Sequence, residues 1–152
     1  MKDRYTIIKE EFDTITGITT VIINTDIGTF EGETKMDDID VQYPSIYHAN
    51  EIAIAKALRK YAKAMLIITR EKMQPLQAIL HQCVWIDDNS DNLIWGKATY
   101  LIRKEIVKLE KEKKLWEKRI EVMSKNITQR IAARDKIVKE YIEKENNKDK
   151  KD

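Results

Sequence analysis

The chain has 152 residues, with 28 Lys and Arg against 26 Asp and Glu and a formal net charge of +2. This length favours one domain with a modest core. The near balance of charge argues against duplex DNA as the main partner, because DNA-binding proteins usually present a plainly basic surface. A single cysteine, Cys83, excludes an internal disulfide and a thiolate metal cluster. We therefore expect no metal and no cofactor.

The charges are unevenly distributed along the chain. Residues 1–50 carry 4 basic and 10 acidic side chains, whereas residues 101–152 carry 17 basic and 11 acidic ones. Such an asymmetry allows pairing within one molecule or between copies. The first residues lack the apolar core of a signal peptide, and the longest apolar run, AMLII, is far too short to span a membrane. We expect a soluble, cytoplasmic protein.

The first third of the sequence predicts three strands. Residues 18–25 are rich in β-branched side chains, and residues 28–36 alternate in polarity. An earlier strand is expected around residues 5–12. Gly17 and Gly28 follow the strand ends, where a hairpin turn needs positive φ. The pattern predicts a three-stranded antiparallel meander, which must pack on a helix to be stable.

The rest of the sequence predicts two long helices. Apolar residues at helical spacing indicate a first helix over residues 46–81, kinked or ended by Pro75. Turn-forming residues predict a loop over residues 84–96, and a second helix is expected over residues 92–145. Residues 146–152 are polar, which is typical of a disordered tail. The predicted fold is α+β, a single domain over residues 1–145 with an N-terminal sheet (1–45) and two helices that form an oligomerising hairpin or coiled coil.

The second helix carries an apolar seam from Ile102 to Tyr141, interrupted by Arg130 and Arg134. A seam of this length must be covered, either by the first helix folded back or by a partner copy. We expect a homo-oligomer, a dimer or higher.

The two seam arginines have alternative explanations. A straight helix repeats every 3.6 residues, so Arg130 drifts to the flank, where its stem covers apolar surface and its head reaches water. Arg134 stays close to the seam whether the helix repeats every 3.5 or every 3.6 residues. A buried guanidinium needs an anionic partner, which is a carboxylate of the protein or a phosphate of a ligand. The sequence leaves both alternatives open.

A short aromatic segment offers further candidates. Trp85 and Trp95 flank the predicted loop, Asn92 lies within it, and Arg103 and Lys104 follow. Aromatic rings stack on nucleobases, amides read base edges and cations bind phosphates; alternatively, the tryptophans cap the core. No catalytic constellation is present, so we expect no enzyme and no catalytic residue. The candidate ligand-binding residues are Trp85, Asn92, Trp95, Arg103, Lys104, Arg130 and Arg134.

The order of elements resembles a family of small phage proteins. The stretch TTVIINTDIGTFEGETKMDDID, with Asp38 and Asp40 near its end, precedes a helix with EIAIAKALRKYAK, a polar loop and a long helix with AARDKIVKEY. In this order they resemble the anti-Thoeris sponges, which capture a cyclic ADP-ribose signal. The resemblance implies an oligomer that binds cyclic nucleotides between subunits. An aromatic, an Asn and helix-borne arginines would form the pocket, with Trp85 or Trp95, Asn92, Arg103 and Lys104 as the nearest matches.

The resemblance implies a function that the residue patterns alone do not reach. The implied function is that of a phage immune-evasion protein, which sequesters a cyclic ADP-ribose isomer without turnover. Some relatives also take cyclic oligonucleotides. The alternative is a phage coiled-coil structural or adaptor protein with no small-molecule ligand. Nucleic acid is an unlikely partner, and no membrane contact is expected.

Overall fold

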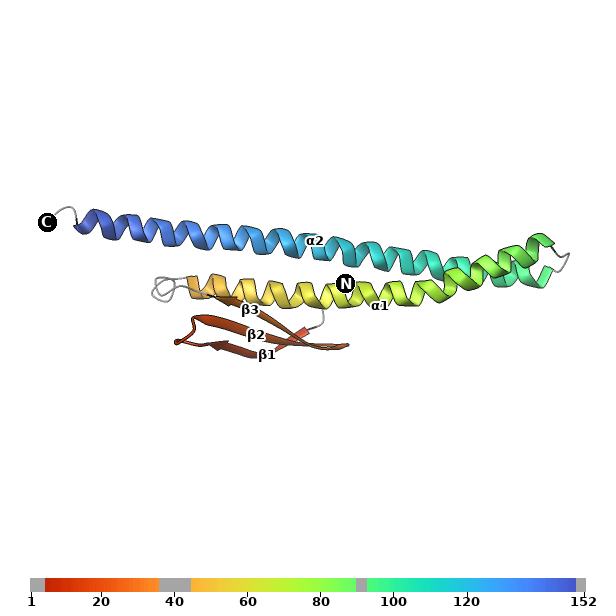
Figure 1. Cartoon of the computed structure of the whole chain (residues 1–152), viewed down its shortest axis with the longest axis horizontal. Coiled ribbons are helices and arrows are strands. Elements are labelled where there is room, and N and C mark those ends of the chain that lie inside the picture. Colours follow the sequence, from red (N-terminus) through yellow and green to blue (C-terminus); the bar gives the residue numbers. More distant parts are fainter. Residues whose placement is uncertain (1–4, 36–44, 90–92, 150–152) are drawn as a thin grey trace. The chain divides into compact units, whose positions relative to one another are not determined.

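The computed structural model describes the backbone of residues 5–35, 45–89 and 93–149. Side chains are described for residues 5–35, 48–82 and 99–148. The fold is α+β, as predicted: a three-stranded antiparallel sheet precedes two long helices (Figure 1). The elements in chain order are β1 (Tyr5–Phe12), β2 (Ile18–Thr25), β3 (Gly28–Lys35), α1 (Ser45–Asn89) and α2 (Leu93–Asp149).

The chain divides into two compact units that share both helices. The sheet unit comprises Met1–Tyr61 and Glu121–Asp152, and the hairpin unit comprises Ala62–Ile120. A single domain over residues 1–145 stays a prediction, because both helices run through both units.

Both helices are longer than predicted. The prediction that α1 ends by residue 81 is wrong, since α1 continues past Pro75 to Asn89. Pro75 removes one backbone donor, but Met73 beside it is buried against Ile106 and Leu109, and this packing outweighs the local cost. Within the predicted loop over residues 84–96, residues 84–89 and 93–96 are therefore helical, and residues 90–92 lie outside the described residues.

The prediction of a disordered tail is wrong for residues 146–149, because α2 continues to Asp149. Lys148 forms an i,i+3 ion pair with Glu145 at 3.9 Å, a spacing at which opposite charges support a helix.

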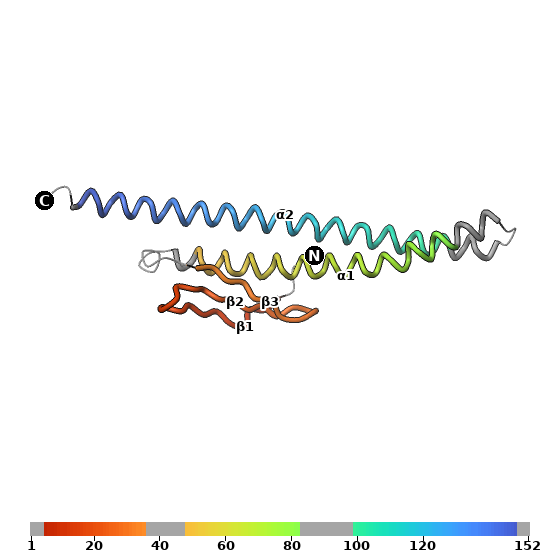
Figure 2. Tube along the Cα trace, viewed as in Figure 1, coloured from red at the N-terminus to blue at the C-terminus, as the bar shows by residue number. Residues whose placement is uncertain are grey.

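The sheet has the predicted meander order, β1-β2-β3 (Figure 2). In the first turn the Asp13 carboxylate accepts a hydrogen bond from the Ile15 amide at 2.9 Å, and Gly17 takes a φ of 70°. The hydrogen bonds from the backbone amides of Ile15 and Thr16 lower the pKa of the Asp13 carboxyl. Only two residues separate β2 from β3, and Gly28 adopts a φ of 134°. A β-bulge interrupts the β1–β2 register between Ile7 and Lys9.

One face of the sheet packs on α1 at very short range. Val21 and Ile23 of β2 are fully buried against Ala53 and Ala57. Gly32 on β3 makes this approach possible. A Cβ there would overlap the Ala53 carbonyl oxygen and lie 2.8 Å from the Ala57 nitrogen. The small side chains of Ala53 and Ala57 allow this close approach from the side of the helix, and Gly32 allows it from the side of the sheet.

The opposite face of α1 packs on α2 within the sheet unit. Ile52 and Ala55 form a cluster with Ile127, and Ile131 packs against it. In the hairpin unit, Met73 of α1 packs on Ile106 and Leu109 of α2. Within each unit α1 therefore covers part of the α2 seam, as expected if the first helix folds back on the second. Self-association stays a prediction, and it now needs a surface other than this seam.

A hydrogen bond ties the β2–β3 turn to α1. The buried Tyr61 hydroxyl donates to an Asp26 carboxylate oxygen at 2.7 Å, and the Tyr61 ring lies 5.7 Å from the Phe30 ring between centroids. The contact fixes the hairpin tip to the helix that supports the sheet.

Replacing Gly32 tests the close approach of sheet and helix. Gly32→Ala should lower the free energy of unfolding by about 2 kcal/mol or more, because the new methyl group meets backbone atoms that cannot move independently. Urea unfolding followed by circular dichroism measures the change. Glu31→Ala, at the exposed neighbouring position, serves as the control and should change stability far less.

Replacing Tyr61 tests the turn anchor. Tyr61→Phe keeps the ring and leaves Asp26 without its donor, so we expect a loss of about 1.5–3 kcal/mol, the range for hydrogen bonds to charged groups. Asp26→Asn retains an acceptor and should cost less. Equal stability of wild type and Tyr61→Phe in urea unfolding would show that the bond contributes nothing.

Candidate functional site

Arg134 occupies an unusual position among the charged residues of the sheet unit. Its side chain is only 14% exposed. One terminal nitrogen, Nη1, lies 3.4 Å from the Thr34 hydroxyl of β3, and the other, Nη2, lies 3.6 Å from an Asp135 carboxylate oxygen. The Nε atom is buried and has no hydrogen-bond partner among the residues that the structure describes.

These contacts leave the guanidinium of Arg134 poorly satisfied. Charge-assisted hydrogen bonds between a guanidinium and an oxygen normally measure about 2.7–2.9 Å, and both contacts of Arg134 are longer. Asp135, its carboxylate neighbour, is 66% exposed and so interacts mainly with solvent. A buried cation is costly unless it is paired and hydrogen-bonded. Arg134 therefore retains donor capacity for an anion.

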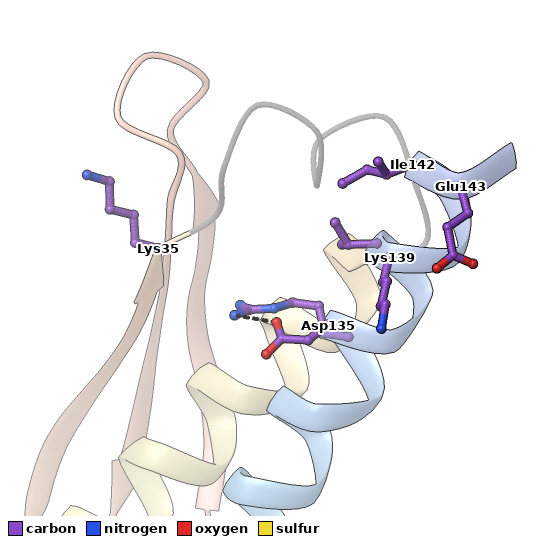
Figure 3. A pocket seen from close by; sticks show the side chains of 7 residues that line it. Lys35, Asp135, Lys139, Ile142 and Glu143 are labelled. Carbon is purple, nitrogen blue, oxygen red and sulfur yellow. Dashed lines mark ion pairs between the residues drawn. The ribbon is translucent and has the colours of Figure 1, made fainter. Parts of the chain in front are cut away.

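Arg134 lines a pocket between the end of β3 and the C-terminal turns of α2. The cavity has a volume of about 470 Å³, within the range of small-molecule sites. Figure 3 shows Lys35 on the strand side, with its side chain directed away from the helix, and Asp135, Lys139, Ile142 and Glu143 along the helix. The lining residues are Lys35, Arg134, Asp135, Val138, Lys139, Ile142 and Glu143. The pocket combines three cations, two carboxylates and two aliphatic side chains.

The electrostatic surroundings of Arg134 favour an anion. Lys56 on α1 donates a hydrogen bond to the Glu33 carbonyl at 3.1 Å. Burial lowers the pKa of the Lys56 ammonium, and the nearby positive charges of Arg59 and Arg134 lower it further, against an opposing contribution from Glu33. Cations crowded together disfavour each other's charged forms, and an anion bound among them relieves this repulsion.

Arg130, the other seam arginine, is paired within the protein. Its Nε donates to the Asn126 side-chain oxygen at 3.0 Å, and its Nη2 lies 3.5 Å from a Glu51 carboxylate oxygen on α1. Its side chain is 30% exposed. The guanidinium therefore bridges two helices, and structural pairing accounts for its place on the seam.

The remaining candidate residues do not join this pocket in the part of the chain that is described. Arg103 and Lys104 are exposed on α2 in the hairpin unit. Trp85 and Trp95 belong to α1 and α2, but their side chains lie outside the described residues, as does all of Asn92. Asp38 and Asp40 also lie outside them.

Sequence reasoning missed most of the pocket. Asp135, Lys139 and Glu143 repeat every four residues directly after Arg134, which places them on one side of the helix. That spacing was a usable signal. The contribution of Lys35 was not foreseeable, because it depends on where the end of β3 meets α2.

The described residues were also searched for metal-binding groups and for membrane-spanning helices. Within residues 5–35, 48–82 and 99–148, no group of three His, Cys, Asp or Glu side chains is placed to hold a metal ion. Among the described helices, none has the length and apolarity needed to cross a membrane.

The geometry therefore supports an anion pocket centred on Arg134.

Comparison of the chain with protein-family models, with curated proteins and with solved structures found no match.

Proposed function

We propose that this protein captures a small phosphate-bearing molecule at the Arg134 pocket. The observation that carries the proposal is that Arg134 lines the cavity although its terminal nitrogens make only long contacts, 3.4 Å from Nη1 to Thr34 and 3.6 Å from Nη2 to Asp135. The two terminal nitrogens of a guanidinium can donate two parallel hydrogen bonds, a geometry that matches two oxygens of one phosphate. Lys139 on the helix side of the pocket adds positive charge.

The ligand class follows from the mixed character of the lining. Val138 and Ile142 give the pocket an aliphatic side next to its cations, which suits a molecule with both a phosphate and a flat or apolar part. A nucleotide has this composition. We propose a cyclic nucleotide, such as a cyclic ADP-ribose isomer, in keeping with the resemblance to phage anti-Thoeris sponges.

The proposed mechanism is sequestration without turnover in the host cytoplasm, as an immune-evasion protein. Binding requires only that the phosphate replace the weak contact between Arg134 and Asp135. No bond in the ligand needs to break, so the ligand should be recovered intact after denaturation of the protein.

Arg134 variants test the capture. In calorimetric titrations against cyclic ADP-ribose isomers, cyclic dinucleotides and cyclic trinucleotides, Arg134→Leu should abolish binding of the best ligand. Arg134→Lys should recover part of the affinity, because a single ammonium lacks the bidentate fork. Without ligand, Arg134→Leu should melt at the same temperature or higher, since an apolar side chain avoids the cost of a buried charge.

Arg70→Leu is the matched control, because it removes an exposed arginine from the hairpin unit. Wild type saturated at about 100 times the dissociation constant should gain about 2.7 kcal/mol of stability. Affinity that survives in Arg134→Leu would remove this residue from the site. Absence of binding by wild type to every compound would favour the coiled-coil adaptor without a ligand.

Asp135 should act as a competitor of the ligand for Arg134. Asp135→Asn removes the carboxylate that lies nearest to the guanidinium, so we expect several-fold tighter binding of the same cyclic nucleotide. Asp149→Asn makes the same charge change at the end of α2 and should leave the affinity nearly unchanged. Weaker binding in Asp135→Asn would show that Asp135 contacts the ligand or holds Arg134 in place.

A further inference from the structure

A second group of cations lies on α1 within the sheet unit, near Arg134. Lys56 and Arg59 are half-buried and lie three residues apart on one side of the helix, and the exposed Lys60 follows them. We call Lys56, Arg59 and Lys60 the α1 cation cluster. Burial and the positive charges of Arg59, Arg134 and Lys60 lower the pKa of the Lys56 ammonium, against an opposing contribution from Glu33. The cluster and Arg134 therefore crowd positive charge into one part of the unit.

The α1 cation cluster has no counter-charge on its own helix. α1 carries no Asp or Glu between Glu51 and Glu71, so no carboxylate lies three or four residues from any member of the cluster. Lys56 instead has Arg59 three residues away and Lys60 four residues away, and like charges at these spacings destabilise a helix. A bound anion would turn this repulsion into attraction.

The contacts of the α1 cation cluster are with neutral groups. Lys56 donates to the Glu33 backbone carbonyl at 3.1 Å, and Arg59 Nη1 lies 3.5 Å from the Ser124 hydroxyl on α2. The Glu33 side chain is exposed and alternates with the inward-facing Thr34, so it lies on the face of the sheet opposite α1. No member of the cluster forms an ion pair with a described residue, so all three keep donors for an anion.

Lys56 and Arg134 reach the same end of β3 from different helices. Lys56 of α1 contacts the carbonyl of Glu33, and Arg134 of α2 contacts the hydroxyl of Thr34, the next residue. Two anionic groups held by these two cations must therefore lie close together. Phosphates that share one bridging oxygen meet this requirement.

We propose that Lys56 and Arg59 form a second phosphate subsite beside Arg134, so that the captured molecule carries two linked phosphates. The inference rests on the proposed function, because it assumes phosphate capture at Arg134, and it narrows the ligand class to diphosphates. Arg134 holds the phosphate in the cavity, and the ammonium of Lys56 and the guanidinium of Arg59 hold the other phosphate on the α1 side of the strand end.

A small anion fits this group of cations better than a nucleic acid does. Arg134 is only 14% exposed, and Lys56 and Arg59 are half-buried. A nucleic-acid backbone is bound by cations that project from the surface, whereas a diphosphate can enter between the two helices and the strand end.

Calorimetric titration with inorganic pyrophosphate and with inorganic phosphate, at matched ionic strength, tests the subsite. Wild type should bind pyrophosphate at least tenfold more tightly than phosphate, because further charge-assisted hydrogen bonds add to those of Arg134. Lys56→Met keeps a side chain of similar length without the charge. It should weaken pyrophosphate binding at least tenfold and leave phosphate binding at Arg134 nearly unchanged.

The phosphate titration also separates binding from structure. If Lys56 only held β3 in place, Lys56→Met would displace Thr34 and weaken both anions alike. Lys56→Arg keeps the charge and should retain most of the affinity for pyrophosphate, and Arg59→Gln should weaken it several-fold. Lys72→Met removes an exposed lysine from α1 in the hairpin unit and should bind both anions like the wild type.

The inference is overturned if the wild type binds neither anion, if it does not prefer pyrophosphate, or if Lys56→Met weakens both anions equally or neither. Selective loss of pyrophosphate in Lys56→Met, in a protein that binds no cyclic nucleotide, would support the subsite and contradict the proposed function. Capture of a cyclic nucleotide that needs Arg134, with no effect of Lys56→Met on either inorganic anion, would do the reverse.

Discussion

The close approach of α1 to the sheet is the constraint on which the sheet unit depends. Gly32 lacks the methyl group that would meet Ala53, and the alanines of α1 present a thin surface to β2 and β3. A three-stranded sheet buries too little on its own, so this contact supplies most of its core. It also keeps the layers near one another. A long side chain from α2 can then reach the strand beyond α1, and Arg134 does so at Thr34.

Arg130 and Arg134 show how the neighbouring helix decides what a seam arginine does. The two residues lie one turn apart on the same stripe of α2. Arg130 faces Glu51 on α1 and lies 3.5 Å from it. Arg134 faces the sheet, where Thr34 offers a hydroxyl and not a charge, so its guanidinium keeps unused donors. The same type of side chain thus links two helices at Arg130 and is a candidate binding group at Arg134.

Local signals in the sequence were sufficient for the strands, because β-branched runs and turn glycines act over a few residues. They failed where packing overrode them. Pro75 and the turn formers after it predicted the end of α1, but burial of Met73 and the neighbouring Leu76 stabilises helix beyond that point. The pocket could be predicted only in part. The four-residue spacing after Arg134 is visible in the sequence, whereas the meeting of β3 with α2 depends on tertiary contacts that no short motif encodes.

The bulge in β1 has a consequence for how the protein avoids aggregation. β1 is an edge strand, and its unpaired backbone groups would otherwise recruit a strand from another molecule. The register shift between Ile7 and Lys9 distorts that edge, and Glu10 lies opposite Val21, which puts a carboxylate on the apolar side of the sheet. An incoming strand would have to bury this charge. The exposed Ile7 and Ile8 are thereby kept from seeding a cross-β stack.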